Sequence, residues 1–267
     1  MSTKKSTVSL KAILSGLIIP IAFIVSILVY IYIFGDGSHF QGGSNENMPL
    51  QGDYYGVIYK GGPIVPILMS LLLTVLAFTF ERFFAIAKAT GRGRVTGFIM
   101  RVNDLLKEDN IEEARELCSK QKGSVASVIN SGLAKYQEMV KETTLNKEQK
   151  IVAIQKEIEE ATSLELPTLQ QNLVIFSTLT TLGTLMGLLG TVIGMIRAFS
   201  ALATAGAPDA VALSTGISEA LINTALGIGT AALAVIFYNI FTTKIDKLTY
   251  AIDETGFMIV NTFSSKH

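Results

Sequence analysis

The chain has 267 residues, of which 49% are hydrophobic and 16% are charged, and its formal net charge at pH 7 is zero. A neutral chain has no general electrostatic attraction to polyanions, so neither nucleic acid nor an acidic surface is expected as a partner. The apolar residues are gathered into long uncharged runs. This clustering indicates a membrane protein rather than a large soluble domain.

Four runs are long enough to cross a bilayer as helices, which takes roughly 20 apolar residues. They cover residues 12–35, 61–80, 172–196 and 220–243. The first run follows Lys4, Lys5 and Lys11, a pattern that also describes a cleaved signal peptide. Its 24 uncharged residues exceed a usual signal core, and no clear small-residue cleavage site follows, so we expect a retained anchor.

The distribution of Lys and Arg predicts the topology, because these residues are kept on the cytoplasmic side. Residues 88–171 hold 13 Lys or Arg, balanced by 13 Asp or Glu, and both termini carry further lysines. The segments 36–60 and 200–218 hold one Lys or Arg between them. We therefore expect both termini and the middle segment in the cytoplasm. Arg197, at the outer end of the third run, is expected to snorkel to the interface or to pair with an acid.

The middle segment is predicted to be a helical domain, since Val95, Phe98, Ile99 and Val102 recur at helical spacing. Pro167 predicts a bend before the third run, where helix and span are expected to form one long rod. The predicted organisation is an anchor at 1–35, a flexible periplasmic linker at 36–60, a transmembrane helix at 61–87, a cytoplasmic helical domain at 88–171, a pore-lining helix at 172–198, a periplasmic loop at 199–218, a pore-lining helix at 219–243 and a cytoplasmic tail at 244–267.

Catalysis of covalent chemistry is not expected. The segment 88–171 contains no Gly-rich phosphate loop and no HExxH motif. Cys118 is the only cysteine, and the two histidines, His39 and His267, both lie outside the apolar runs. We expect no metal, no cofactor and no enzyme activity.

The third run carries hydroxyl groups and small residues at regular spacing. Ser177, Thr184 and Thr191 are each seven residues apart, which places them along one slightly drifting stripe of a helix. Glycines of the same run let neighbouring helices approach closely: Gly183, Gly187, Gly190 and Gly194, joined by Gly227 in the last run. Taken alone, a threonine here fits a packing role, because Ser and Thr also bond to their own helix backbone.

The last run begins with a carboxylate, Glu219, followed by Asn223 and Thr224. Glu219 and Asn223 are four residues apart and share a helix face, whereas Thr224 is rotated from Glu219 by about 140°. A carboxylate at the edge of a span either is solvated among headgroups or faces a bundle interior or a watered cavity, and the second is favoured here. The two runs together make a polar lumen plausible.

These residues carry a resemblance. "GLLGTVIGM" (187–195) followed by "ISEALINTALGIGTAALAVIFYN" (217–239) resembles the ExbB/TolQ branch of the MotA/TolQ/ExbB proton-channel family, and "EARELCSKQKGSVASVINSGL" resembles its cytoplasmic helices. The resemblance implies an all-α membrane protein with three family transmembrane helices, here preceded by an extra N-terminal one, and long helices extending into a cytoplasmic helical domain.

The resemblance also implies partners and roles. It implies a homopentamer in the bacterial inner membrane, in contact with membrane lipid, that surrounds two single-span ExbD- or TolR-like subunits and drives a TonB-like protein. Thr191 and Thr224 match the family's pore threonines and Glu219 its buried glutamate, while the protonatable aspartate lies on the partner. Thr184, Ser177 and Asn223 are added as pathway candidates. A TolQ-like envelope motor, a MotA-like stator and a non-channel scaffold remain alternatives.

Overall fold

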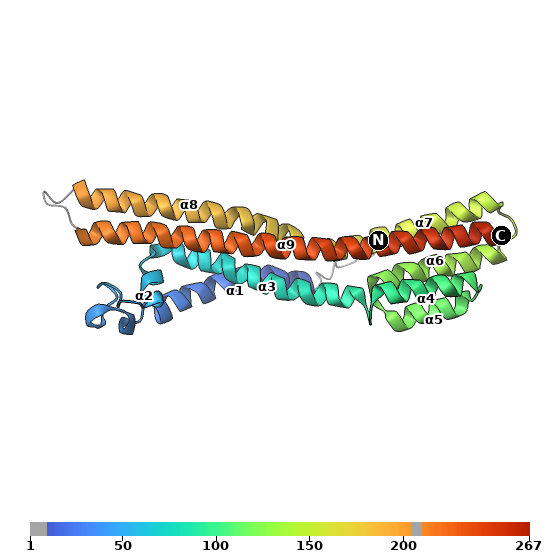
Figure 1. The fold of residues 1–267 in the computed structure, drawn as a ribbon, viewed down its shortest axis with the longest axis horizontal. Helices are drawn as coiled ribbons and strands as arrows, with labels where there is room; N and C mark the ends of the chain where they lie inside the picture. The colour runs from blue at the N-terminus through green and yellow to red at the C-terminus, as the bar shows by residue number, and fades with distance from the viewer. Residues whose placement is uncertain (1–9, 204–209) are drawn as a thin grey trace, which may run out of the picture. The chain divides into compact units, whose positions relative to one another are not determined.

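The computed structural model describes residues 10–203 and 210–267, and throughout these ranges the regular structure is helical, apart from one isolated bridge between Phe40 and Pro49 (Figure 1). The chain forms two compact units. Unit 1 comprises the described residues of Met1–Thr79 and Val174–Tyr238, and unit 2 comprises Phe80–Leu173 and Asn239–His267.

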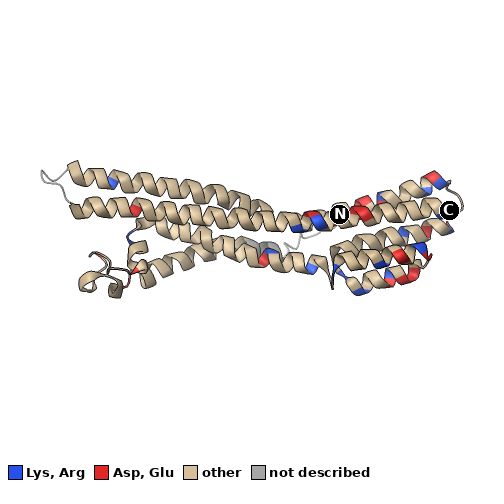
Figure 2. Ribbon diagram, viewed as in Figure 1, with Lys and Arg blue, Asp and Glu red and all other residues tan. Residues whose placement is uncertain are grey.

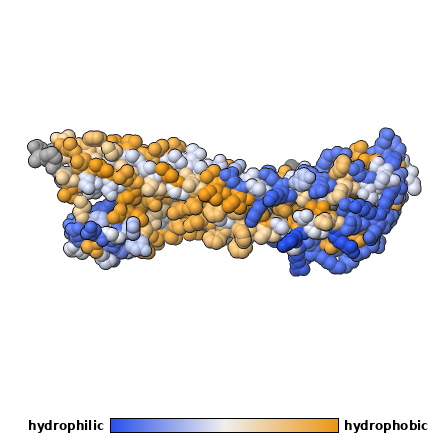
Figure 3. Space-filling model, viewed as in Figure 1, coloured by the Kyte–Doolittle hydropathy of each residue, from blue (hydrophilic) through white to orange (hydrophobic). Residues whose placement is uncertain are grey.

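Four helices are long and apolar enough to cross a membrane, which confirms the prediction of an all-α membrane protein. The first is α1 (Leu10–Leu28), which continues as a π-helical stretch at Val29–Phe34. The others are α3 (Val65–Thr90), α8 (Leu173–Ala203) and α9 (Ala210–Lys266). Leu, Ile, Val and Phe fill these helices, so their hydrophobic surface is broad rather than confined to one stripe (Figure 3).

The prediction of a flexible linker at 36–60 was wrong. This segment, which we call the connector, contains two short 3₁₀ turns (Gly37–His39 and Gln41–Gly43) and the helix α2 (Tyr54–Tyr59), and a third turn follows at Gly62–Ile64. Polar side chains satisfy its backbone, since Asp36 accepts from the backbone of Ser38 and Asp53 caps α2. Phe40, only 2% exposed, supplies a small core.

The predicted periplasmic loop and cytoplasmic tail are largely helical. Helix α8 continues to Ala203 and α9 begins at Ala210, so only residues 204–209 of the predicted loop at 199–218 lie outside the described residues. Helix α9 also runs on through 244–266, because apolar side chains recur there at helical spacing and are buried in unit 2: Ile245, Leu248, Ile252, Ile259 and Phe263.

Unit 2 adds four amphipathic helices to parts of α3 and α9. They are α4 (Val95–Lys107), α5 (Ile111–Gln121), α6 (Gly123–Lys141) and α7 (Lys147–Gln170). Their apolar faces are buried and many charged side chains lie on their outer faces, whereas Lys, Arg, Asp and Glu are sparse along α1 and α8 (Figure 2). The predicted helical domain at 88–171 is thus joined by the C-terminal part of α9.

The predicted rod of helix and span is interrupted. Pro167 lies inside α7, which ends at Gln170; the break follows at Gln171 and Asn172, and Asn172 has a φ of 64°. A left-handed residue ends the ladder of helical hydrogen bonds, so α7 and α8 are separate helices. Near this break the buried Arg82 donates to the carboxylate of Glu81 and to the backbone oxygen of Leu169.

Candidate functional site

Helices α8 and α9 approach each other through glycine. A methyl group on Gly227 of α9 would lie 2.5 Å from the backbone oxygen of Gly183 and 2.7 Å from the Cα of Gly187, both on α8. Such contacts require an atom to move, so the absence of side chains is what lets the two backbones meet. The other glycines of the predicted set also face α9: Gly190 lies against Asn223, and Gly194 lies against Ala220 and Gly216.

Thr191 and Thr224 come together at the edge of this contact. Their hydroxyl groups, one from α8 and one from α9, are hydrogen-bonded to each other. The Thr191 hydroxyl also lies 3.1 Å from the backbone oxygen of Gly187, to which it can donate. Both residues are half-buried. Since Thr191 has two acceptors and each hydroxyl has one proton, either threonine can serve as the donor within the pair.

The other two hydroxyls of the predicted stripe do not join this pair. Ser177 and Thr184 are exposed, and the Thr184 hydroxyl donates to the backbone oxygen of Thr180 in its own helix. The 100° per residue turn of an α-helix explains the difference, because a seven-residue spacing drifts by about 20° per repeat and so rotates Thr184 and Ser177 away from the position of Thr191. Thr191 is the member of the stripe that reaches α9.

Glu219 is buried, with its side chain 4% exposed, and it is paired with Arg197. One guanidinium nitrogen, Nη1, lies 2.6 Å from Oε1 and 2.8 Å from Oε2 of the carboxylate. Arg197 itself is half exposed. Of the two alternatives predicted for Arg197, the structure therefore shows pairing with an acid, and it identifies that acid as Glu219.

Asn223 is fully buried one turn beyond Glu219. Its Nδ2 donates to the backbone oxygen of Gly61 at 2.8 Å, while its Oδ1 has no hydrogen-bond partner among the described residues. Asn223 and Glu219 thus point toward the turn that precedes α3. Thr224 lies on another face of α9, as the helical geometry predicts.

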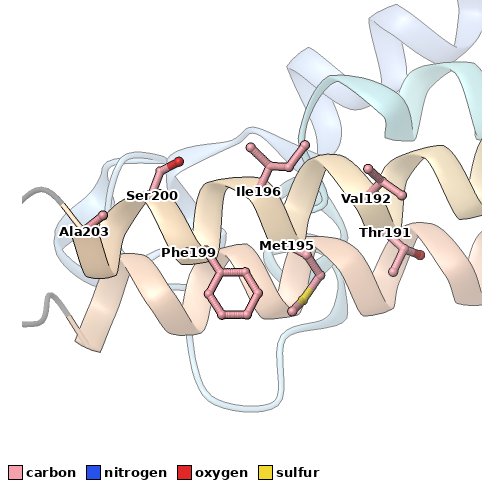
Figure 4. Close-up of a pocket in the computed structure, with 7 residues that line it drawn as sticks. All are labelled: Thr191, Val192, Met195, Ile196, Phe199, Ser200 and Ala203. Atoms are coloured by element: carbon pink, nitrogen blue, oxygen red, sulfur yellow. The ribbon is translucent and has the colours of Figure 1, made fainter.

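A shallow, open apolar groove of about 600 Å³, lined by residues of α8, extends along that helix from Thr191 (Figure 4). It begins at Thr191 and continues along the side chains of Val192, Met195, Ile196 and Phe199. Val192, Ile196 and Phe199 are more than half exposed. The groove therefore places the hydroxyl group of Thr191 at the end of an exposed apolar face of α8. In the part of the chain that the structure describes, no group of three or more His, Cys, Asp or Glu could hold a metal ion.

Residues 121–254, half of the chain, match the family model of the MotA/TolQ/ExbB proton channel family. This chain belongs to that family. The matched range contains the glycine contact, the threonine pair, Arg197 and Glu219. Together with the four candidate spans it supports a multi-pass inner-membrane protein.

Two curated proteins are similar to parts of the chain. The putative biopolymer transport protein ExbB-like 3 of Synechocystis sp. is 41% identical over 86 residues, which are 32% of this chain and 41% of that protein. The Tol-Pal system protein TolQ of Pseudomonas aeruginosa is 28% identical over 124 residues, 46% of this chain and 54% of that protein. The chain thus spans about half the length of the curated relatives it matches. Both relatives fit the ExbB/TolQ branch.

Sequence reasoning missed the turn at Gly61 and Gly62. Gly62 has a φ of 76°, and a methyl group there would lie 2.3 Å from Oε1 of Glu219. The available signal was the pair of glycines followed by Pro63, which is typical of a turn. Nothing in the spacing of the sequence connects this turn to Glu219, because more than 150 residues separate them.

Proposed function

We propose that this chain is the channel subunit of a proton-driven inner-membrane motor of the ExbB/TolQ kind, with both termini in the cytoplasm. The observation that carries the proposal is the Thr191–Thr224 hydroxyl pair beside an open apolar groove, in a chain of the proton-channel family. A hydroxyl group both donates and accepts, so the pair can keep a hydrogen bond to a carboxyl group that gains and loses a proton.

The protonatable carboxyl group belongs to a partner in this proposal. The described part of unit 1 contains four carboxylates, and three of them lie in the connector: Asp36, Glu46 and Asp53. The fourth, Glu219, is held by Arg197. A helix that brings an aspartate to the groove would supply the missing acid. It would also cover Val192, Ile196 and Phe199, whose exposed side chains need an apolar neighbour.

We propose a homopentamer around two single-span ExbD- or TolR-like subunits as the assembly. Its lumen is lined by α8 and α9, with Thr191 and Thr224 facing the partner helices and Thr184 and Ser177 further along the same wall. The exposed positions of Thr184 and Ser177 support this arrangement, since a lumen wall is uncovered in a single chain. Asn223 and Glu219 lie behind that wall.

TonB-dependent outer-membrane transport is the output that we favour, in line with the ExbB-like relative at 41% identity. A TolQ-like role in envelope maintenance is the second candidate, because the similarity to TolQ extends over more of the chain. Deletion of the gene separates the two. Loss of TonB-dependent uptake supports the first role, whereas sensitivity to detergents with normal uptake supports the second.

The test of the channel itself compares two substitutions at each threonine. Valine keeps the shape of threonine and removes the hydroxyl, whereas serine keeps the hydroxyl and removes a methyl group. The complex is purified from native membranes through a tag on this chain and placed in liposomes, and proton flux is followed with an internal pH-sensitive dye under an imposed membrane potential. We expect Thr191→Val and Thr224→Val to assemble normally but to lose flux, and the serine variants to keep most of it.

A packing role for the threonines leads to a different result. A hydrogen bond between membrane helices is worth only about 0.6 to 2 kcal/mol, so loss of packing alone leaves an assembled complex with near-normal flux. Normal flux in both valine variants would refute the proposed role of the pair. Absence of a co-purified single-span protein with an aspartate in its span would refute the proposed partner.

A further inference from the structure

The carboxylate of Glu219 lies where three separate parts of unit 1 meet. Arg197 reaches it from α8, and Glu219 itself belongs to α9. The third part is the turn at Gly61 and Gly62, which leads from the connector into α3. At Gly62 the backbone passes so close to Oε1 that a methyl group would lie 2.3 Å from it, and 3.3 Å from Nη1 of Arg197.

A second contact joins the same turn to α9. Asn223, one helical turn from Glu219, donates to the backbone oxygen of Gly61 at 2.8 Å. A methyl group on Gly61 would lie 2.9 Å from Cγ2 of Ile222. Glu219, Ile222 and Asn223 of α9 thus lie against two adjacent glycines, so the turn is fixed in place by hydrogen bonding and close packing together.

The connector is tied to this turn by its own hydrogen bonds. Tyr30, in the π-helical stretch that continues α1, donates to the backbone oxygen of Tyr59 at 2.9 Å, and the two rings stack with centroids 4.7 Å apart. Lys60 donates to the backbone oxygens of Asn45 and Glu46. Hence the turn is the place where α1 and the connector are linked to α8 and α9.

We propose that Arg197 is a positioning residue: its ion pair with Glu219 fastens the Gly61–Gly62 turn, and with it the connector and α1, to the pair of helices that carries Thr191 and Thr224. Glu219 then serves as a fixed anchor and not as a carrier of protons. The anchor role of Glu219 rests on the proposed function, whereas the fastening of the turn by the ion pair does not.

The proposal predicts an order among charge-neutralising variants. Removing one member of a buried ion pair leaves the other charge without compensation, whereas replacing both by neutral groups of similar shape costs far less. Arg197→Gln strands the buried carboxylate of Glu219, so it should loosen the turn most. Glu219→Gln leaves only the half-exposed Arg197 unpaired, so it should loosen the turn less. The double variant, Arg197→Gln with Glu219→Gln, places two amides side by side, and these can hydrogen-bond to each other.

The readout is amide hydrogen exchange of residues 53–64 in the full-length protein in detergent, followed by mass spectrometry. We expect exchange about tenfold faster in Arg197→Gln and a return toward the wild-type rate in the double variant. Unchanged exchange in Arg197→Gln, or a double variant no better than Arg197→Gln alone, would overturn the proposal. A variant that fails to fold is recognised by fast exchange throughout α6. In that case, a comparison of Gly62→Ala with Gly52→Ala tests the contact between the turn and Glu219.

A second comparison uses two glycines that both have a positive φ, a conformation that disfavours alanine. Gly62 and Gly52 have φ angles of 76° and 84°, but a methyl group on Gly52 would meet no atom within 4 Å. Gly52→Ala therefore reports the backbone strain alone, and Gly62→Ala adds the collision with Glu219. We expect faster exchange at 53–64 in Gly62→Ala than in Gly52→Ala; equal rates would contradict the contact.

Proton flux in liposomes separates this proposal from the proposed function. The double Gln variant lacks a carboxylate at 219, so near-normal flux together with restored exchange supports a fixed anchor. Loss of flux with restored exchange would show that Glu219 takes part in proton movement and overturn the anchor role. A wild-type complex without flux would refute the proposed function and leave the exchange comparison intact.

Discussion

The hydroxyl of Thr191 on α8 is hydrogen-bonded to the hydroxyl of Thr224 on α9, although 33 residues separate them in the chain. This bond forms at the edge of a contact in which Gly183, Gly187 and Gly227 bring the two backbones together. The pair depends on the glycines, because larger side chains at the contact would push the hydroxyl groups out of hydrogen-bonding distance.

The direct bond between the two threonines predicts non-additive effects on stability. Thr191→Val and Thr224→Val each remove the shared hydrogen bond, so the double variant should lose less free energy of unfolding than the two single losses added. The expected coupling is about 0.6 to 1.7 kcal/mol. Unfolding in detergent, with the four proteins of the cycle side by side, measures it; strict additivity would mean that the hydroxyls do not interact in the folded protein.

The glycine contact predicts opposite results at two positions of α9. Gly227→Ala places a methyl group 2.5 Å from a backbone oxygen of α8 and should lower the free energy of unfolding by about 1–3 kcal/mol, and it should also weaken assembly. Gly229→Ala, two residues away, meets no atom within 4 Å and should be neutral or slightly stabilising, since alanine favours helix. Thermal unfolding of both proteins is the measurement, and a harmless Gly227→Ala would contradict the close approach.

Cys118 is predicted to be unreactive in the folded protein and dispensable. Burial raises the pKa of its thiol to about 12, so almost no thiolate, the reactive form, is present at pH 8. Alkylation by a maleimide should be slow in native protein and fast once the chain is unfolded. Cys118→Ala should assemble and support transport. Rapid alkylation of the native protein would show that this part of unit 2 opens easily.

Tyr136 packs edge to face against Phe263, with ring centroids 5.0 Å apart, and joins α6 to the C-terminal part of α9. It is 1% exposed, and its hydroxyl has no hydrogen-bond partner among the described residues. Tyr136→Phe should therefore be neutral or stabilising, whereas Tyr136→Ala should cost about 3–5 kcal/mol through the cavity it leaves. Circular dichroism melts compare the two; a strongly destabilised phenylalanine variant would point to a hydrogen bond of the hydroxyl.

The connector should lose stability in acid. His39 Nδ1 lies 2.8 Å from Asp53 Oδ2, and this hydrogen bond holds the pKa of Asp53 below its usual value of 3.8. A carboxyl group with a lowered folded-state pKa stabilises the fold above its unfolded pKa and loses that contribution as pH falls through the folded value. Relative to the intrinsic exchange rate at each pH, exchange of residues 53–59 should rise below about pH 4 in the wild type, and this rise should be smaller in Asp53→Asn, which starts from a faster rate.

The four spans and the helical character of the chain followed from the sequence alone, because long uncharged runs and apolar residues at helical spacing are local features. The same local features led to the glycines and threonines of the last two runs. Boundaries were less accurate. The segment 199–218 reads as a loop by its small residues, but α8 and α9 extend into it over its described residues. The segment 244–267 reads as a tail by its lysines, but burial of its apolar side chains in unit 2 keeps it helical.

What only the tertiary structure decided is which polar groups meet. The sequence determined that Glu219 begins an apolar run and that Arg197 ends another, so each needs compensation in a membrane. It could not determine that they compensate each other over the Gly61–Gly62 turn, since pairing depends on how α8, α9 and the connector approach. The connector is a second example. Its Gly, Ser and Asn residues predict a flexible linker from the sequence alone. In the structure it is folded, because Phe40 is buried and Asp36, Asp53 and Lys60 form hydrogen bonds to its backbone.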